Sequence, residues 1–253
     1  MSVSRIIQNR MKYLAFLLLF FSLTSFTSFS SFAQEFQSDM LPSANVLTAE
    51  QVQQALSQNV LILDTRPKEV VAAGFVPGSL HLEAGGAFSR FLPLLIDEHE
   101  PYIIIAEEEK VDDLLAQLEE LGRREIRGVV WDQAILPAPL EQSALISFED
   151  LKTLLETPAN APGNAAEMQF IDMRTHSEYA EGHIPYFDNI PLQELEERAE
   201  NIRRDQPVVI HCRSGVRAAT AYSILRRMGF DQILNYSGGT NDWTEKGEEL
   251  TRM

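Results

Sequence analysis

Two short apolar runs that each end in an aspartate recur along the chain, at residues 60–64 and 170–172, and each aspartate is followed two positions later by an arginine. The aspartates, Asp64 and Asp172, are 108 residues apart, and Gly74 and Gly182 are separated by the same distance. A constant offset at several points predicts an internal duplication.

The repeat extends in both directions from these runs. Upstream, Thr48 and Ser147 each precede apolar residues at helical spacing, which predicts a capped helix in each half. Downstream, the apolar runs 102–106 and 208–212 are typical of buried strands, and the helical patterns after them stop at glycines suited to a left-handed C-cap, Gly122 and Gly229. Short apolar strands that alternate with helices predict an α/β fold, in which each half is a parallel sheet with helices on both faces.

The matching halves predict two domains, at residues 44–134 and 144–253. The segment 134–143 between them contains Pro137 and Pro139 and is interpreted as a linker.

Residues 1–33 have a different character. A basic stretch with Arg5, Arg10 and Lys12 is followed by an apolar run and then by small residues ending at Ala33. This order predicts a secretory signal peptide cleaved after Ala33, and so a periplasmic or secreted protein with no membrane attachment after cleavage. An uncleaved membrane anchor is the alternative, although the apolar run is shorter than the roughly 20 residues of a membrane span.

Composition narrows the range of partners. A formal net charge of −16 argues against binding to nucleic acid or to anionic membrane surfaces. The single cysteine excludes an intramolecular disulfide, and the five histidines show no metal-ligand spacing, so no metal and no cofactor are expected.

The single cysteine, Cys212, follows an apolar strand and precedes a short loop, with a helix predicted to begin near Arg217. Backbone N–H groups in such a loop can form an anion cradle, and the helix N-terminus adds positive potential. Arg213 and Arg217 add two positive charges, while Gly215 allows a tight turn. These features favour the reactive thiolate. The alternative is a buried structural cysteine.

The sequence resembles the rhodanese (sulfurtransferase) superfamily over nearly the whole chain after residue 33. The motifs that carry the resemblance are Asp172-Met173-Arg174, Glu178-Tyr179, Gly182-His183-Ile184, the loop 212–217, Gly229-Phe230, Gly238-Gly239 and Trp243. Four residues separate Cys212 from Arg217, whereas the related phosphatases have five, so the loop favours sulfur chemistry over phosphoryl transfer.

The resemblance implies that the Cys212 thiolate accepts sulfane sulfur as a persulfide, from a donor such as thiosulfate or a persulfide, and that a thiol, a cyanide-like nucleophile or a protein then removes it. It implies that the loop (Ser214, Gly215 and Val216) holds the anions together with Arg213. By the same resemblance, Arg217 closes the loop and pairs with a carboxylate.

Asp172 and Arg174 resemble the family's strand-end pair, which helps to shape the donor pocket; a purely structural ion pair is the alternative. His183 is interpreted as a scaffold residue, and His211 is expected to face away from the thiol. Tyr186 and Phe187 replace the small residues usual in the family, and we expect both aromatics to reshape the mouth of the pocket.

The first half lacks the chemistry of the second. Where the cysteine loop would lie, it has Glu107-Glu108-Glu109, with neither a thiol nor a cationic cradle. It is therefore expected to be structural or an interaction surface. Two functions remain open at this level: a sulfurtransferase, or a persulfide carrier, redox sensor or protein-interaction module without turnover.

Overall fold

The computed structural model describes residues 45–158 and 163–252, which belong to one compact unit. The predicted signal peptide, 1–33, lies outside the described residues. Among the residues that the structure describes, no helix is long and apolar enough to cross a membrane.

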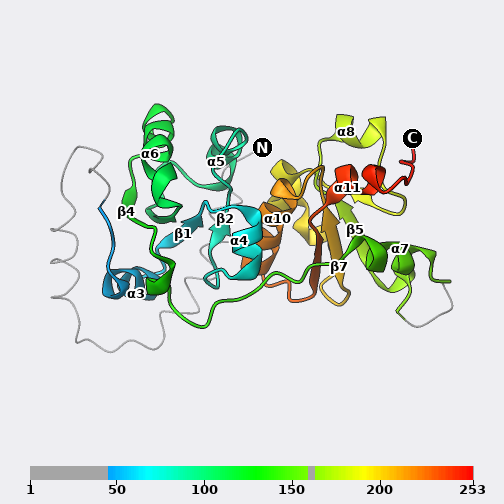
Figure 1. The fold of residues 1–253 in the computed structure, drawn as a ribbon, viewed down its shortest axis with the longest axis horizontal. Coiled ribbons are helices and arrows are strands. Elements are labelled where there is room, and N and C mark those ends of the chain that lie inside the picture. The colour runs from blue at the N-terminus through cyan, green and yellow to red at the C-terminus, as the bar shows by residue number, and fades with distance from the viewer. Residues whose placement is uncertain (1–44, 159–162, 253) are drawn as a thin grey trace. The chain divides into compact units, whose positions relative to one another are not determined.

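The unit contains two parallel sheets with the same strand order, one in the N-terminal half (residues 45–143) and one in the C-terminal half (residues 144–252) (Figure 1). The first has the order β2-β1-β3-β4, with β1 at Leu61–Asp64, β2 at Leu80–His81, β3 at Tyr102–Ile105 and β4 at Ile126–Val130. The second has the order β6-β5-β7-β8, with β5 at Gln169–Asp172, β6 at Asp188–Asn189, β7 at Val208–His211 and β8 at Ile233–Tyr236. The predicted α/β fold with parallel sheets is confirmed.

Helices cover both faces of each sheet. The α-helices of the N-terminal half are α3 (Ala49–Ser57), α4 (Lys68–Ala73), α5 (Phe88–Leu95) and α6 (Val111–Glu120). Those of the C-terminal half are α7 (Phe148–Glu156), α8 (His176–Glu181), α9 (Leu195–Arg198), α10 (Val216–Arg227) and α11 (Gly239–Glu245). Short 3₁₀ helices complete the chain, at η1 (Glu108–Lys110), η2 (Gln133–Ile135), η3 (Ala165–Glu167), η4 (Leu192–Glu194) and η5 (Ala199–Asn201).

Alternate strand residues point to opposite faces, and this places the core. In β3, Ile104 joins one hydrophobic cluster, while Ile103 and Ile105 join another with residues of α3. The cluster that contains Ile104 continues without interruption into the C-terminal half, where it includes Ile210 and Leu225. The two halves therefore share one core.

The predicted helix ends are confirmed by the geometry of their caps. The Thr48 side chain accepts a hydrogen bond from the Gln51 N–H in a complete capping box, and the Ser147 side chain accepts from the Asp150 N–H. Gly122 and Gly229 follow α6 and α10 with φ of +69° and +83°, the left-handed conformation that favours glycine.

Helix α10 joins the two halves, because it contacts β2 and α4 as well as its own sheet (Figure 1). The His81 N–H on β2 donates to Ser223 Oγ at 2.9 Å, and the rings of Phe75 and Tyr222 meet edge to face with centroids 6.2 Å apart. The predicted linker is bound to the N-terminal half, since Glu141 exchanges two backbone hydrogen bonds of 2.9 Å with Phe75.

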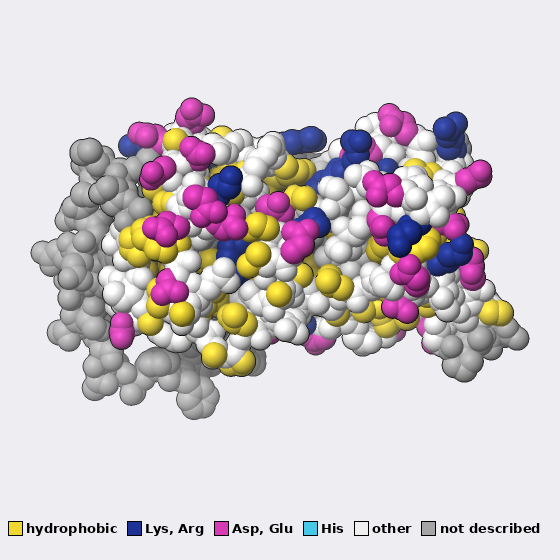
Figure 2. Space-filling view, in the orientation of Figure 1, with side chains coloured by type: hydrophobic (Ala, Val, Ile, Leu, Met, Phe, Trp, Pro, Cys, Tyr) yellow, Lys and Arg dark blue, Asp and Glu magenta, His cyan; other side chains and the backbone are white. Residues whose placement is uncertain are grey.

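Acidic side chains are spread over the visible surface of both halves, with basic side chains among them (Figure 2). This distribution agrees with the net charge of −16.

Candidate functional site

The loop after β7 places one backbone amide against the sulfur of Cys212. Strand β7 ends at His211, and α10 begins at Val216. Between them the Gly215 N–H donates to Cys212 Sγ at 3.2 Å. A sulfur at the N-terminus of a 12-residue helix, with an amide pointing at it, lies where a negative charge is stabilised.

Helix α11 holds the same loop from the other side. The carbonyl of Cys212 accepts from the Thr240 N–H, and the carbonyl of Arg213 accepts from the Asn241 N–H, both at 3.0 Å. These bonds tie the loop carbonyls to α11, while the N–H of Gly215 points at the sulfur.

Two glycines permit this packing. Gly215 has φ of +87°, and a Cβ there would lie 2.1 Å from the carbonyl oxygen of Ser237. Gly239 has φ of +63°, and a Cβ there would lie 2.3 Å from the carbonyl oxygen of Cys212. Any larger residue at either position would force the backbone of the loop to move.

Arg217 closes the base of the loop through a bidentate ion pair. Its two terminal nitrogens donate to the carboxylate oxygens of Glu178 at 2.6 and 2.7 Å. The hydrogen bond from Arg217, helped by bonds from Thr175, lowers the pKa of Glu178 from 4.5 to about 2. Glu178 is thus the carboxylate partner that the family resemblance implied without identifying it.

Sequence reasoning missed Glu178 as a site residue, although one signal was present. Thr175 and Glu178 have capping-box spacing, and the structure shows a complete box at the start of α8. The cap fixes the Glu178 backbone, so that its carboxylate can both accept from Thr175 and reach Arg217.

Three other predicted loop residues are more exposed than the sulfur. Arg213 and Ser214 are exposed, and Val216 is half-buried. The Arg213 side chain is therefore accessible to an anion from solvent, whereas the Arg217 guanidinium is occupied by Glu178.

Asp172 and Arg174 form a buried link rather than an open binding surface. Arg174 Nη2 donates to Asp172 Oδ2 at 2.6 Å and to the Gly182 carbonyl at 2.8 Å, and Nη1 donates to the Glu178 carbonyl at 3.2 Å. In the half without a cysteine, Arg66 makes the matching bonds to Asp64 and to the Gly74 carbonyl. The recurrence favours the structural alternative for this pair, with Arg174 also supporting the backbone of Glu178.

Phe187 does not reshape the pocket mouth, which corrects the expectation from the sequence. Its ring is 2% exposed and packs edge to face against Phe170 and His211, with centroids 5.1 and 4.3 Å apart. Burying an apolar ring in the core removes its surface from water and so stabilises the fold. Tyr186, by contrast, is 70% exposed.

The two histidines make contacts with the backbone. His211 Nδ1 lies 2.9 Å from the Cys212 carbonyl oxygen and not against the thiol, and burial lowers the pKa of its ring. His183 Nδ1 lies 3.1 Å from the Tyr179 carbonyl oxygen, and its ring stacks on that of Tyr179.

The corresponding position in the N-terminal half has a different structure. After β3 and Ala106, the chain enters the short helix η1, which presents exposed Glu108, Glu109 and Lys110. Over the ranges 45–158 and 163–252, no group of three or more His, Cys, Asp or Glu residues could hold a metal ion.

Comparison with known proteins places residues 147–246 in a family. These residues match the model of the rhodanese-like domain. The chain is 40% identical over 96 residues to the uncharacterized protein YqhL of Bacillus subtilis, covering 38% of this chain and 75% of that protein. It is 36% identical over 81 residues to a sulfurtransferase of Allochromatium vinosum, covering 32% of this chain and 76% of that protein.

A third relative is longer than the matched region. The putative sulfur carrier protein YrkF of Bacillus subtilis is 36% identical over 81 residues, which cover 32% of this chain and 44% of that protein. Residues 147–246 match the family model, and the aligned regions cover about three quarters of the length of two relatives. The chain therefore belongs to the rhodanese-like family.

Proposed function

We propose that this protein is an exported sulfurtransferase that carries sulfane sulfur as a persulfide on Cys212. The observation that supports this most directly is the Gly215 N–H, which donates to Cys212 Sγ at 3.2 Å at the start of α10. An amide and a helix N-terminus stabilise a thiolate and, equally, the terminal sulfur anion of a persulfide.

The first half-reaction loads the cysteine. The Cys212 thiolate attacks the outer sulfur of thiosulfate, a bond forms between the two sulfurs, and the sulfur–sulfur bond of the donor breaks. Sulfite leaves with the electron pair of that bond, and the protein keeps one sulfur as Cys212–S–S⁻. With a persulfide donor the leaving group is the thiolate of the donor instead.

The second half-reaction returns the protein to its starting state. A nucleophile attacks the terminal sulfur, and the Cys212 thiolate leaves with the electron pair of the sulfur–sulfur bond of the persulfide. Cyanide would give thiocyanate, and a thiol, whether small or on an acceptor protein, would give a new persulfide. Arg213, Ser214, Gly215 and Val216 bind the anions at the loop, while the Arg217–Glu178 pair holds the loop in shape.

The proposal includes two rhodanese-like domains in tandem, at residues 44–134 and 144–253, with catalysis in the second. Its support is the common strand order and the matching Asp64–Arg66 and Asp172–Arg174 links. The N-terminal half would be catalytically silent, since it has no cysteine. Export rests on the residue pattern of 1–33, and the acidic charge argues against nucleic acid as a partner.

A persulfide carrier without turnover is the competing function, and one observation favours it. Cys212 is only 1% exposed, so a bulky acceptor would need the loop to open before it could reach the sulfur. A carrier would load one sulfur and release it only to a specific partner protein.

Mass spectrometry of the intact protein tests the proposal. Wild type incubated with thiosulfate should gain one sulfur atom on Cys212 and lose it to cyanide, with many thiocyanate molecules formed per protein. Cys212→Ser in the full chain should gain no sulfur, because a serine hydroxyl stays protonated near neutral pH, and it should show no residual transfer from the N-terminal half.

The competing outcomes are distinct. Loading without repeated turnover would identify the carrier. No loading from thiosulfate, glutathione persulfide or inorganic polysulfide would refute sulfur transfer, and transfer by the Cys212→Ser protein would refute a silent first domain.

A further inference from the structure

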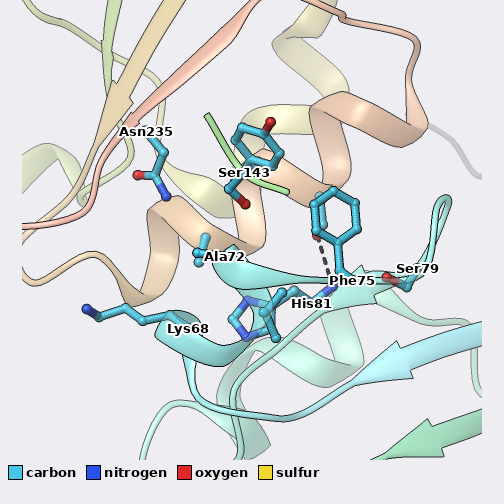
Figure 3. A pocket seen from close by; sticks show the side chains of 11 residues that line it. Lys68, Ala72, Phe75, Ser79, His81, Ser143 and Asn235 are labelled. Atoms are coloured by element: carbon cyan, nitrogen blue, oxygen red, sulfur yellow. Dashed lines mark hydrogen bonds between the residues drawn. The ribbon is translucent and has the colours of Figure 1, made fainter. Parts of the chain in front are cut away.

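A lysine from the other half of the molecule lies beside the cysteine loop. Lys68 is the first residue of α4, and its side chain passes beside Gly215: a Cβ on that glycine would lie 3.2 Å from Lys68 Cδ. The Lys68 ammonium is two bonds further along the same side chain. Figure 3 shows Lys68 extending away from Phe75 and His81, at the edge of the small pocket between the two halves.

Of the two arginines in the loop, one is already paired with a carboxylate. Arg217 is bound through two nitrogens to Glu178, which neutralises it, and Arg213 is the accessible arginine of the loop. A donor such as thiosulfate carries two negative charges and approaches a protein with a net charge of −16. A second positive charge beside Arg213 would therefore help to bring the donor to the sulfur.

We propose that Lys68, from the half without a cysteine, binds the anionic group of the sulfur donor at the cysteine loop of the other half. This deepens the proposed function and rests on it, because it assigns a small dianion of the thiosulfate class as the donor. The N-terminal half then has a part in donor binding, although it carries out no chemistry of its own.

The present partner of Lys68 is suited to being displaced. The ammonium bonds Glu69 Oε1 at 2.5 Å, and the Glu69 side chain is 70% exposed, whereas that of Lys68 is 20% exposed. An ammonium has three donors, so it can bind an incoming anion while it keeps or exchanges Glu69. An ion pair between neighbouring residues in which one partner is exposed contributes little stability and competes only weakly with a dianion.

Steady-state kinetics with thiosulfate and cyanide test the assignment in the full-length protein. Lys68→Met keeps the apolar stem beside Gly215 and removes the charge. It should raise the KM for thiosulfate about two- to fivefold, the range for a partly exposed ion pair, with little change in kcat. Lys68→Arg should restore the KM. Glu69→Gln should lower the KM for thiosulfate, because the substitution removes the carboxylate that pairs with the Lys68 ammonium.

Lys110→Met is the matched control, since it removes the same charge from the exposed end of η1 and should leave the KM unchanged. Added salt should raise the KM of wild type more steeply than that of Lys68→Met. Equal KM values for Lys68→Met and wild type, or an equal rise for Lys110→Met, would overturn this inference alone. A wild type that accepts no sulfur from thiosulfate would overturn the inference and its donor class, whereas loading from persulfides would leave the proposed function standing.

Discussion

Replacing Glu178 by Gln tests whether the Arg217–Glu178 pair holds the cysteine loop. The substitution keeps the size of the side chain and an oxygen able to accept from Thr175, but it removes the charge and the bidentate geometry with Arg217. The Arg217 side chain, which is only 16% exposed, would then lose its ion-pair partner, and the loop would lose the bond that anchors it.

The magnitude follows from the lowered pKa of Glu178. That pKa moves from 4.5 to about 2, with the bond from Arg217 as the largest cause and the bonds from Thr175 contributing, and each pKa unit corresponds to about 1.4 kcal/mol of differential stabilisation. The full shift would give about 3 kcal/mol. Because the Glu178 side chain is 28% exposed, solvent screening reduces the expected loss in the free energy of unfolding to about 1–2 kcal/mol.

The pH dependence has a definite sign. A carboxyl whose pKa is lower in the folded than in the unfolded protein stabilises the fold above the unfolded value and loses that contribution as the pH falls through the folded value. The stability difference between wild type and Glu178→Gln should therefore be complete above pH 4.5 and should shrink towards pH 2. Other carboxyl groups titrate in both proteins, and their effects largely cancel in the difference.

Urea unfolding at several pH values measures this difference, and thiosulfate turnover measures its consequence for the loop. Turnover of Glu178→Gln should fall about tenfold or more, since misplaced site groups commonly have effects of this size. Glu181→Gln, at the exposed end of the same helix, is the matched control and should change stability by less than about 0.5 kcal/mol. A Glu178→Gln protein as stable as wild type at pH 7, or a difference that persists undiminished at pH 2, would refute this account.

Two further substitutions test the packing around the loop and α10. Gly215→Ala should lower the free energy of unfolding by about 3 kcal/mol or more and prevent persulfide formation although Cys212 is retained, because its Cβ would lie 2.1 Å from the Ser237 carbonyl oxygen. Gly122→Ala has a similar positive φ with open space around it, so urea unfolding should show a loss of only about 1 kcal/mol. Ser223→Ala leaves the buried His81 N–H without its acceptor, and urea unfolding should show a loss of about 1–3 kcal/mol; no measurable loss would mean that the halves are not joined there.

The sequence was sufficient for features that depend on neighbouring residues. The period of apolar positions identified the strands, Thr48 and Ser147 identified helix starts, and Gly122 and Gly229 identified helix ends. These features are local, so they need no knowledge of the tertiary fold.

Features that depend on distant residues were not predictable in the same way. Glu178 and Arg217 are 39 residues apart and meet only because α8 and α10 lie near the same end of the second sheet. Phe187 follows an exposed tyrosine, and only the tertiary packing shows that its ring turns into the core against His211. No local pattern distinguishes Lys68 from any other lysine near a helix start. Lys68 lies beside Gly215 in the fold, but almost 150 residues separate the two in the sequence.

The half without a cysteine has a structural role that is evident at α10. The residues of this helix from Thr220 to Leu225 are all buried, and a helix that is enclosed so completely needs a partner beyond its own sheet. Phe75 and His81 supply contacts to Tyr222 and Ser223, two residues of that helix. Since Gly215 is the N-cap of α10, contacts that fix the helix also fix the N–H of Gly215 relative to the sulfur. A preorganised amide requires such support, so the N-terminal half can contribute to the site as a scaffold although it has no cysteine.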